Sequence, residues 1–496
     1  MNVCQNHIFL LFLAHLKGTK KMVMVRTIIG RAREKEILDD AINSNRSELI
    51  AIYGRRRIGK TYLIREYYSK HIIFKVTGLS SGTRDAQIKN FMLKLSEVTD
   101  DFKKEKLPSD WLDAFNYLKK FIERIKVSKK KKVLFIDEFP WIDTLRSGFL
   151  PAFENFWNDY CTTRDDLVVV VCGSAASYMV KSIVFNKKGL SKRITKTIKL
   201  NAFNLQETKE FFDYKRIPME KMELLKVYMA FGGIAEYLEN IKKGESSVTA
   251  IDRMCFQKDA YLENEFDEVF KSLFEENSFH HKIMIILSKN KKKGMSRDEI
   301  IKELKISSGG RFSASLDDLI YSGFVLKYDA HEGNKKRTLH RIYDEFCMFY
   351  LQFMATFKGS SWTQIYQKQE YITWCGYAFE TICLKHSSEI KKALKCDQIR
   401  SNNYSWYNPN AQVDLVIDRD DAIVNLCEMK FYNDEFSMDE TYLKRLRKKE
   451  TEFKTSTQTK KGIHTAMITT CGVKENQYSQ AILVDNITMD CLFEAN

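Results

Sequence analysis

The sequence lacks the cysteine patterns that hold disulfide-rich domains or metal sites together. Its eleven cysteines are scattered, with no C-x-x-C pair and no Cys/His spacing typical of zinc ligands. This scatter argues against a structural zinc site and against a disulfide framework. It fits reduced thiols in the cytoplasm.

The sequence also lacks an apolar run that could cross a bilayer. The segment from His7 to Leu16 is apolar but too short to span the hydrocarbon core, and it has neither a basic flank nor a cleavage site of small residues. We therefore expect no membrane association. We interpret residues 1–23 as a non-native or disordered extension, with Met22 or Met24 as the true start.

The composition is ordinary for a globular protein except for its charge. A length of 496 residues predicts about two to four domains, and 44% hydrophobic with 29% charged residues argues against a disordered chain. The formal net charge of +15 favours an anionic partner such as nucleic acid. Lysine runs are usually solvated surface, so charge alone does not identify that partner.

One stretch has a strong chemical signature, the sequence Gly-Arg-Arg-Arg-Ile-Gly-Lys-Thr from Gly54 to Thr61. It satisfies G-x-x-x-x-G-K-[ST], in which backbone N–H groups surround phosphate oxygens, Lys60 reaches the β- and γ-phosphates and the Thr61 hydroxyl binds Mg²⁺. A strand over 48–53 and a helix over 61–68 are predicted on either side, as this loop requires. The predicted ATP-binding residues are Gly54, Arg55, Arg56, Arg57, Ile58, Gly59, Lys60, Thr61 and Tyr62.

A second signature follows the apolar run Val133–Ile136, which predicts a strand buried in a parallel sheet. The run ends in Asp137 and Glu138, and carboxylates at the end of a buried strand are costly unless a cation meets them. We interpret Asp137 as a partner of the same Mg²⁺, acting through water. We interpret Glu138 as the base that orients the attacking water.

Two further polar residues stand near the ends of predicted strands. Ser174 follows the apolar run 167–173 at the end where parallel sheets bind ligands, so it either senses the γ-phosphate or caps the next helix. Arg193 precedes a strand over 194–200; it contacts phosphate, reaches the nucleotide of a neighbouring copy or forms an ordinary surface pair. Strands alternating with helices predict a parallel α/β sheet whose carboxyl edge brings the loop and the acids together.

Four segments together resemble the archaeal-type P-loop ATPases, a family of signal-transducing ATPases related to AAA+ proteins. They are the loop from Gly54 to Thr61, Leu-Phe-Ile-Asp-Glu-Phe at 134–139, Cys-Gly-Ser at 172–174 and Phe-Gly-Gly-Ile-Ala-Glu-Tyr-Leu at 231–238. The resemblance implies an ATPase core (24–203), a helical lid (204–262), a winged helix (263–345), a helical connector (346–373) and a nuclease-like α/β domain (374–496). The family usually has proline where Ala235 stands, which leaves the lid geometry open there.

The pattern changes to helices and a hairpin after residue 280. It predicts helices over 281–288, 300–304 and 313–321 and strands over 324–328 and 338–342. In a winged helix the third helix would enter a DNA major groove, and Lys335, Lys336 and Arg337 in the hairpin would contact phosphate. The third helix also has Asp317 and Asp318, which would repel DNA, so DNA binding and packing within the chain both stay open.

The C-terminal part places acids and a lysine at predicted strand ends. Strands over 412–418 and 423–430 form a predicted hairpin, on which Glu428 and Lys430 project from one face and Asp414 can lie opposite them. Metal-assisted phosphodiester hydrolysis needs carboxylates that hold Mg²⁺ and a lysine that steadies the transition state. This hairpin therefore predicts a second, separate chemical site.

These C-terminal residues resemble the PD-(D/E)xK restriction-endonuclease-like fold. Glu380, in a predicted helix, matches the extra acid that the first helix of that fold often contributes. Val413 replaces the proline of the motif, so the resemblance supports the fold more than the activity.

Together these patterns predict an α/β protein that binds and hydrolyses ATP with Mg²⁺. The expected catalytic residues are Lys60, Glu138 and Arg193; the expected metal ligands are Thr61 and Asp137 in the ATPase and Glu380, Asp414 and Glu428, with Lys430, in the nuclease-like site. We expect ATP to act as a switch that repositions the winged-helix and nuclease-like domains on DNA, and a homo-oligomer or a protein partner stays open. In the alternative interpretation the chain is a nucleotide-gated scaffold for a protein partner, with a catalytically silent C-terminal domain.

Overall fold

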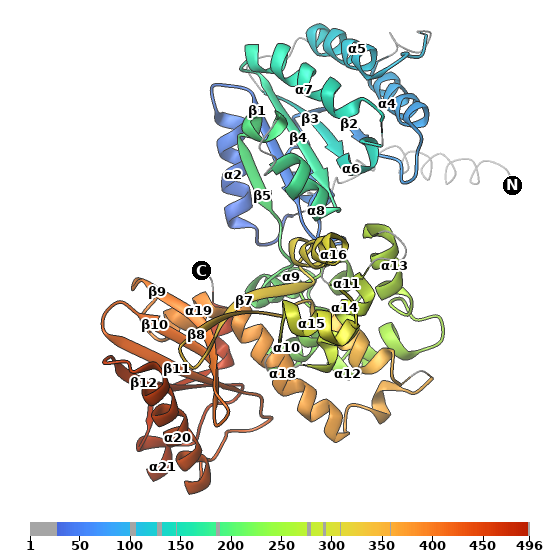
Figure 1. Cartoon of the computed structure of the whole chain (residues 1–496). Coiled ribbons are helices and arrows are strands. Elements are labelled where there is room, and N and C mark those ends of the chain that lie inside the picture. Colours follow the sequence, from blue (N-terminus) through green and yellow to red (C-terminus); the bar gives the residue numbers. More distant parts are fainter. Residues whose placement is uncertain are drawn as a thin grey trace, which may run out of the picture.

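A computed structural model of the chain describes residues 27–99, 106–125, 131–144, 146–184, 189–274, 279–290, 294–307, 309–357 and 359–494. The predicted extension at 1–23 and the candidate start at Met24 lie outside the described residues. Figure 1 shows the chain folded around two sheets, one formed by its N-terminal half and one toward its C-terminus. Among the described residues, no helix combines the length and the apolar character that crossing a bilayer requires.

The first sheet is parallel. Its strands are β1 (Glu48–Tyr53), β2 (Ile72–Thr77), β3 (Lys132–Asp137), β4 (Leu167–Gly173) and β5 (Lys196–Lys199), in the order β2-β3-β4-β1-β5. Every residue of β1, β3 and β4 is buried, as expected for strands covered on both faces. Because these three strands are neighbours and run parallel, their carboxyl ends meet at one edge of the sheet.

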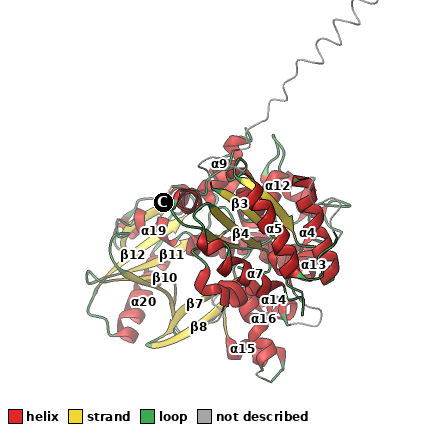
Figure 2. Ribbon diagram, turned by 90° about the horizontal axis from the view of Figure 1, so that it is seen from above, coloured by secondary structure: helices red, strands yellow, loops and turns green. Residues whose placement is uncertain are grey.

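Helices cover both faces of this sheet (Figure 2). One face packs against α2 (Ala32–Asn43) and α3 (Lys60–Tyr67), the other against α4 (Arg84–Val98), α5 (Trp111–Arg124) and α7 (Phe149–Asp159). The alternation along β1 explains the division, because Ile50 and Ile52 face the first group and Leu49 and Ala51 the second. The connections contain the short helices α6 (Phe139–Ile142), η2 (Cys161–Thr163), α8 (Ala176–Tyr178), η3 (Met179–Val184) and η4 (Gly189–Arg193).

A set of helices follows where the lid is predicted. They are α9 (Leu205–Tyr214), α10 (Lys221–Phe231), α11 (Ala235–Glu239), α12 (Ser247–Ile251) and η5 (Asp252–Phe256). Helix α13 (Glu265–Leu273) comes next and lies within the predicted winged-helix region, 263–345. Helix α9 begins at a capping box formed by Asn204 and Glu207. Gly232 ends α10 with φ 62°, and a Cβ on Gly233 would lie 1.9 Å from the carbonyl oxygen of Phe203. The glycine pair therefore combines a helix end with a close approach of two backbone segments.

The described parts of residues 280–342 form helices and a hairpin in the predicted order, with one short strand added. The elements are α14 (His280–Lys289), β6 (Met295–Ser296), α15 (Arg297–Leu304), α16 (Gly310–Tyr321), β7 (Val325–Glu332) and β8 (Lys335–Ile342). Figure 1 shows α16 directly below the first sheet and its helices.

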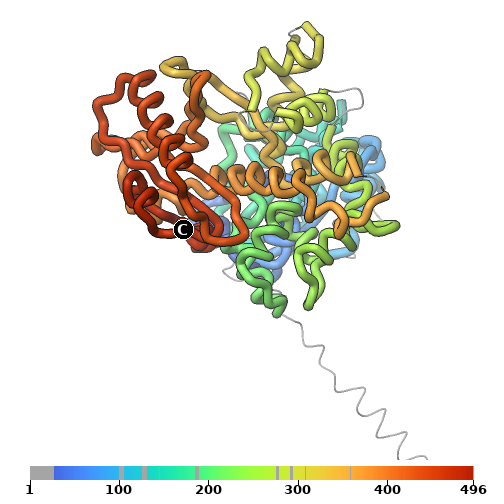
Figure 3. The backbone as a smooth tube through the Cα atoms, turned by 90° about the horizontal axis from the view of Figure 1, so that it is seen from below, coloured from blue at the N-terminus to red at the C-terminus, as the bar shows by residue number. Residues whose placement is uncertain are grey.

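The C-terminal part begins with helices and continues as a mixture of strands and helices. The helices are α17 (Glu345–Phe349), η6 (Tyr350–Met354), η7 (Trp362–Gln364), α18 (Gln369–Lys385), α19 (Ser387–Ala393), α20 (Glu440–Thr457), α21 (Gln477–Gln480) and η8 (Met489–Phe493). The strands are β9 (Ser401–Tyr407), β10 (Gln412–Arg419), β11 (Ile423–Lys430), β12 (Gly462–Thr469) and β13 (Leu483–Thr488). Seen from below, the red C-terminal strands and helices lie to one side of the rest of the chain (Figure 3).

The second sheet joins the hairpin to the C-terminal strands. Its order is β13-β12-β11-β10-β9-β7-β8-β6, in which β7 and β9 run parallel. The antiparallel pairing of β10 with β11 agrees with the predicted hairpin. The β7–β9 pairing joins the predicted winged-helix and nuclease-like domains in one sheet. The sequence did not indicate this pairing, because the largely polar sequence of β9 lacks the apolar run that predicts a strand.

Candidate functional site

The predicted phosphate loop joins the end of β1 to the start of α3. Gly54 has φ 155°, and a Cβ there would lie 2.2 Å from the carbonyl oxygen of Leu200. Gly59 has φ 95°, a conformation that side chains disfavour. Both glycines of the motif are therefore required by the backbone, and the helix N-terminus that follows them favours an anion.

Lys60 is buried and closes the loop on itself. Its Nζ donates hydrogen bonds to the carbonyl oxygens of Gly54, at 3.0 Å, and Arg55, at 2.8 Å. Burial lowers the pKa of Lys60. A phosphate would be a stronger acceptor for this ammonium than two carbonyls, because bonds between charged groups are shorter and stronger.

Thr61 and Asp137 contact each other beside the loop. The Thr61 hydroxyl lies 2.9 and 3.2 Å from the two carboxylate oxygens of Asp137. Asp137 is buried at the end of β3, and burial raises its pKa. A hydroxyl and a carboxylate are oxygen ligands of the kind that Mg²⁺ prefers, and a cation would offset the burial of this acid. The pair therefore fits a Mg²⁺ ion.

Glu138 and Ser174 contact each other at the ends of β3 and β4. The Ser174 hydroxyl donates to Glu138 Oε1 at 2.7 Å, and the Ser174 N–H donates to Oε2 at 3.1 Å. Glu138 adopts φ 46°, a left-handed conformation that is strained for glutamate. Helix α8 begins after Ala175 without a side-chain cap, so the Ser174 hydroxyl binds Glu138 instead of capping that helix. Ser174 thereby positions the carboxylate.

A cavity of about 860 Å³ opens at this edge of the sheet. The phosphate loop, Glu138 and Ser174 line one side of it. Arg31 and Phe203 line another part, where the guanidinium lies 4.4 Å from the ring centroid. Arg193 is exposed on η4 and is not among the described residues that line this cavity. The residues predicted to bind phosphate and the ring of Phe203 thus line one cavity, an arrangement that fits a nucleotide.

The loop arginines take different directions. Arg56 lines the cavity. Arg57 also lines it but pairs with Glu265 of α13 at 2.8 Å. Arg55 is buried and pairs with Asp344 at 2.5 Å. The arginine run therefore connects the loop to two distant segments of the chain, a role that the loop motif does not indicate.

The predicted C-terminal residues lie close together. Lys430 Nζ is 2.9 Å from Glu428 Oε1 and 3.8 Å from Asp414 Oδ2. Burial, followed by the neighbouring Glu380 and Glu428, raises the pKa of Asp414 to about 7. Burial also disfavours the charge of Glu428, but Lys430 and Lys449 outweigh it and lower the pKa of Glu428 to about 2. Asp414 and Glu428 thus both pair with one lysine, and their pKa values are shifted in opposite directions.

Protein cations balance the charge of these acids. Glu380 pairs with Arg341 of β8 at 2.9 Å, and Glu428 pairs with Lys449 of α20 at 2.5 Å. The sequence did not indicate either cation, because the partners are 39 and 21 residues apart. In the part of the chain that the structure describes, no group of three or more His, Cys, Asp and Glu side chains is placed to hold a metal ion. As arranged, the predicted nuclease-like residues do not form a metal site.

Helix α16, the predicted DNA-recognition helix, packs against the ATPase core. Its Asp318 accepts hydrogen bonds from Lys181 Nζ, at 2.8 Å, and from the Ser177 hydroxyl, both located after β4. His280 Nε2 lies 3.4 Å from the other carboxylate oxygen. Although burial opposes the charge, the bonds from His280, Lys181 and Ser177 lower the pKa of Asp318 to about 2. An acid expected to repel DNA thus serves packing within the chain.

We expect Asp318→Asn to lower the free energy of unfolding at neutral pH by about 1 to 3 kcal/mol. The folded-state pKa is lower than the ordinary value of 3.8, so this stabilisation is present above about pH 4 and is lost as the pH falls toward 2. Urea unfolding at pH 7 and pH 3 measures the change. The difference in the free energy of unfolding between Asp318→Asn and the parent should be smaller at pH 3 than at pH 7. The variant Asp317→Asn, at an exposed neighbouring position, should show little change at either pH. An equal difference at both pH values would show that the charge of Asp318 does not stabilise the fold.

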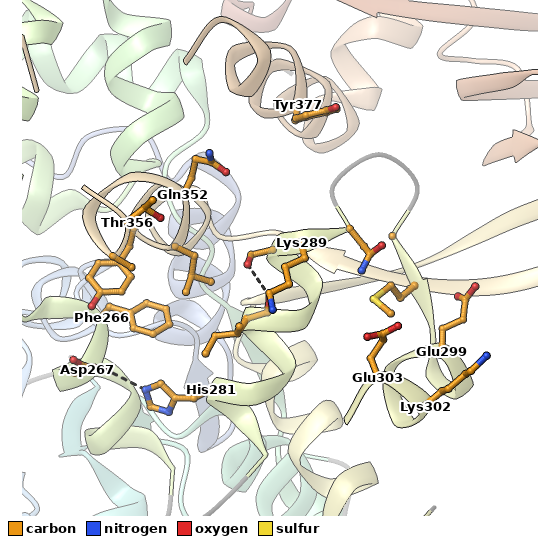
Figure 4. Close-up of a pocket in the computed structure, with 18 of the residues that line it drawn as sticks. Phe266, Asp267, His281, Lys289, Glu299, Lys302, Glu303, Gln352, Thr356 and Tyr377 are labelled. Atoms are coloured by element: carbon orange, nitrogen blue, oxygen red, sulfur yellow. Dashed lines mark hydrogen bonds and ion pairs between the residues drawn. The ribbon is translucent and has the colours of Figure 1, made fainter. Parts of the chain in front are cut away.

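A larger groove, of about 1290 Å³, lies beside α14 and α15 (Figure 4). His281 lies 3.5 Å from Asp267 at one end, and Glu299, Lys302 and Glu303 line the other. Its lining mixes both signs of charge and includes no residue of the phosphate loop. The smaller cavity is therefore the candidate nucleotide site.

The parallel sheet, the glycine loop and the acids at its edge define a P-loop ATPase domain. Residues 29–241 match the family described as an ATPase domain predominantly from Archaea. An uncharacterized protein of Methanocaldococcus jannaschii is 26% identical over 400 residues, covering 78% of this chain and 83% of its own length. An uncharacterized ATP-binding protein of the same organism is 46% identical over 39 residues, 8% of this chain and 66% of that protein. The chain thus has an ATPase-like P-loop domain of the archaeal type.

Several solved structures are similar to this chain. A Walker-type ATPase of Pyrococcus abyssi has 15% identity and a TM-score of 0.46, with 66% of this chain and 96% of that chain covered. The ORC2 protein of Aeropyrum pernix, in ADPNP and ADP complexes, has 13% identity and a TM-score of 0.40, with 65% and 92% covered. The RuvB Holliday junction branch migration motor of Thermotoga maritima has 12% identity and a TM-score of 0.33, with 63% and 92% covered.

Proposed function

We propose that this protein is an AAA+-like regulatory ATPase, which binds and hydrolyses ATP and acts on DNA through its C-terminal parts. The observation that supports this most strongly is the contact of Thr61 with Asp137 beside the Lys60 loop, with Glu138 held by Ser174 at the same sheet edge. The absence of a disulfide pattern in the sequence supports a cytoplasmic location.

Each residue of the site has a separate role in the proposed hydrolysis. Lys60, once turned from the loop carbonyls, would bind the β- and γ-phosphates. Thr61 and Asp137 would hold Mg²⁺, which supplies charge neutralisation on the phosphate oxygens when bound. Glu138 would accept a hydrogen bond from the attacking water and orient it, while Ser174 keeps that carboxylate in place. If copies assemble, Arg193, which is exposed, would reach a neighbour's nucleotide.

The proposed contact with DNA uses α14–α16 and the β7–β8 hairpin as a winged helix. In the hairpin, Lys336 pairs with Asp329 and Arg337 with Glu332, and all of these side chains are substantially exposed. Exposed ion pairs contribute little stability, so DNA phosphates can replace the acids. Because α16 packs on the ATPase core, it must separate from the core before it can enter a DNA groove. A nucleotide switch would supply that release.

A nucleotide-gated scaffold for a protein partner is the second candidate. It is favoured by the pairing of Glu380 with Arg341 and of Glu428 with Lys449, which leaves the predicted metal ligands bound to protein cations. It is also favoured by the packing of α16 within the chain. On this alternative the C-terminal unit recognises a protein and performs no chemistry.

ATP turnover with and without duplex DNA, followed by gel analysis of that DNA, distinguishes the two functions. For action on DNA we expect turnover to respond to the duplex. Mg²⁺-dependent nicking that Asp414→Ala and Lys430→Ala abolish would add a nuclease to that function. Asp397→Ala, at an exposed position of the same unit, is the matched control. An ATP turnover rate that is the same with and without duplex DNA, together with DNA that is not nicked, would favour the scaffold.

A further inference from the structure

The segment from Arg341 to Glu345 connects the nucleotide site to the C-terminal unit through buried ion pairs. The pairs are Arg55–Asp344, Arg341–Glu380 and Lys385–Glu345. The side chains of all six residues are at most 13% exposed. One partner lies in the phosphate loop and two lie on α18, so this short segment contacts both.

Arg55 is fixed to its surroundings by several contacts. Its Nε lies 2.5 Å from Asp344 Oδ2, and its Nη2 donates to Oδ1 at 3.2 Å. The guanidinium lies over the rings of Tyr237 and Phe324, with 5.6 and 5.4 Å to their centroids. Asp344 also accepts the N–H of Cys347 at 2.8 Å and so caps α17. A shift of Arg55 therefore acts directly on the start of α17.

The backbone of the same residue is bound to Lys60. The carbonyl oxygen of Arg55 accepts a hydrogen bond from Lys60 Nζ at 2.8 Å, and Gly54 accepts the other at 3.0 Å. A phosphate that draws Lys60 toward a nucleotide removes both bonds. Arg55 thus contacts Lys60 through its backbone and Asp344 through its side chain, so it links the nucleotide site to this ion pair.

Buried ion pairs transmit such a shift because their partners do not separate easily. Breaking one leaves an uncompensated charge in a medium of low dielectric, which is far more costly than moving both partners together. On the far side, Arg341 holds Glu380 at 2.9 Å and Glu345 holds Lys385 at 2.6 Å, and both partners are part of α18. A displacement of Asp344 therefore reaches α18 along these two pairs.

We propose that the segment Arg341–Glu345 is an electrostatic relay that transmits the state of the phosphate loop to α18 and to the carboxylate cluster of the C-terminal unit. The relay rests on the proposed nucleotide site and specifies how that site regulates the C-terminal unit. Through this relay the phosphate loop would change the position of Glu380, an acid whose charge acts on Asp414. The protein thereby couples two sites without an external partner.

Hydrogen–deuterium exchange of the full chain, with and without Mg²⁺ and the ATP analogue AMP-PNP, tests the relay. A separate titration with a fluorescent nucleotide measures binding. In the parent protein we expect exchange in the peptides of α18 to change by about tenfold, within the range common for coupled sites. A parent that binds no nucleotide would overturn the proposed function and the relay together. A parent that binds nucleotide with unchanged exchange in α18 would overturn the relay alone.

Two variants isolate the pair between the loop and the segment. Asp344→Asn keeps an oxygen for the Cys347 N–H but leaves Arg55 unpaired. The double variant Arg55→Met with Asp344→Asn removes both charges, so no unpaired charge is buried and the fold is spared that cost. At saturating nucleotide we expect the response of α18 in both variants to fall below about twofold. A full response in the double variant would overturn the relay.

A matched control breaks a different pair between the lid and the C-terminal segment. Lys221 of α10 lies 2.5 Å from Asp490 of η8, and these side chains are 41% and 57% exposed. Asp490→Asn should keep the full response of α18, because this pair lies outside the relay and is screened by solvent. A response lost equally in this control would show a general loosening of the chain and would overturn the relay.

Discussion

We expect Lys60→Ala to lower the affinity for ATP by at least about a hundredfold, or about 2.8 kcal/mol. The ammonium is the charged donor nearest the carbonyls of Gly54 and Arg55, in the loop where the phosphates would bind. Arg55 and Arg57 cannot readily replace it, because they are paired with Asp344 and Glu265. Titration with a fluorescent ATP analogue measures the loss.

The control for this variant is Lys70→Ala, at an exposed position after α3. It removes the same charge and the same atoms from the surface, so it should bind ATP as the parent does. Burial already disfavours the charge of Lys60, so Lys60→Ala should keep the fold, which circular dichroism can check. A folded Lys60→Ala protein with parental affinity would show that the loop is not the nucleotide site.

We expect Glu138→Gln to bind ATP but to hydrolyse it about a hundred to ten thousand times more slowly, the usual range for loss of a general base. The amide oxygen can accept the Ser174 N–H, now 3.1 Å from Glu138, and the amide nitrogen can donate to the Ser174 hydroxyl oxygen, so the site should keep its shape. It cannot take a proton from water or orient it as a carboxylate does. Release of inorganic phosphate measures turnover, and the titration above measures binding.

Glu97→Gln is the matched control for the second variant. Glu97 lies on α4, is 51% exposed and pairs with Lys94. The same chemical change there should leave turnover unaltered. Parental turnover in Glu138→Gln would remove Glu138 from the role of base and would leave Ser174 without its proposed function.

Local sequence signals predicted the ATPase core well. Apolar runs predicted β1, β3 and β4, and the structure confirms all three as buried parallel strands. The G-x-x-x-x-G-K-T loop was predictable because the backbone at Gly54 and Gly59 leaves a side chain little freedom. The meeting of Thr61 with Asp137 followed from the rule that the carboxyl ends of the parallel strands of one sheet lie at one edge.

Contacts between distant segments were not predictable from the sequence alone. Arg55 and Asp344 are 289 residues apart, and neither has a local pattern that signals the other. Arg341 lies near the end of β8, and no local pattern signals that the fold brings Glu380 of α18 against it. Asp318 similarly resembles a surface acid on a polar helix face, and only the packing of α16 on Lys181 gives it a partner. Such pairs depend on how domains pack, which residue spacing does not encode.

A structure of the protein with an ATP analogue and Mg²⁺ would decide whether the loop is the nucleotide site. We expect the triphosphate within the loop from Gly54 to Thr61 and Lys60 Nζ moved from the carbonyls of Gly54 and Arg55 onto phosphate. We also expect the metal ion beside Thr61 and Asp137. A nucleotide bound in the groove beside His281, with Lys60 still bound to the loop carbonyls, would contradict this assignment.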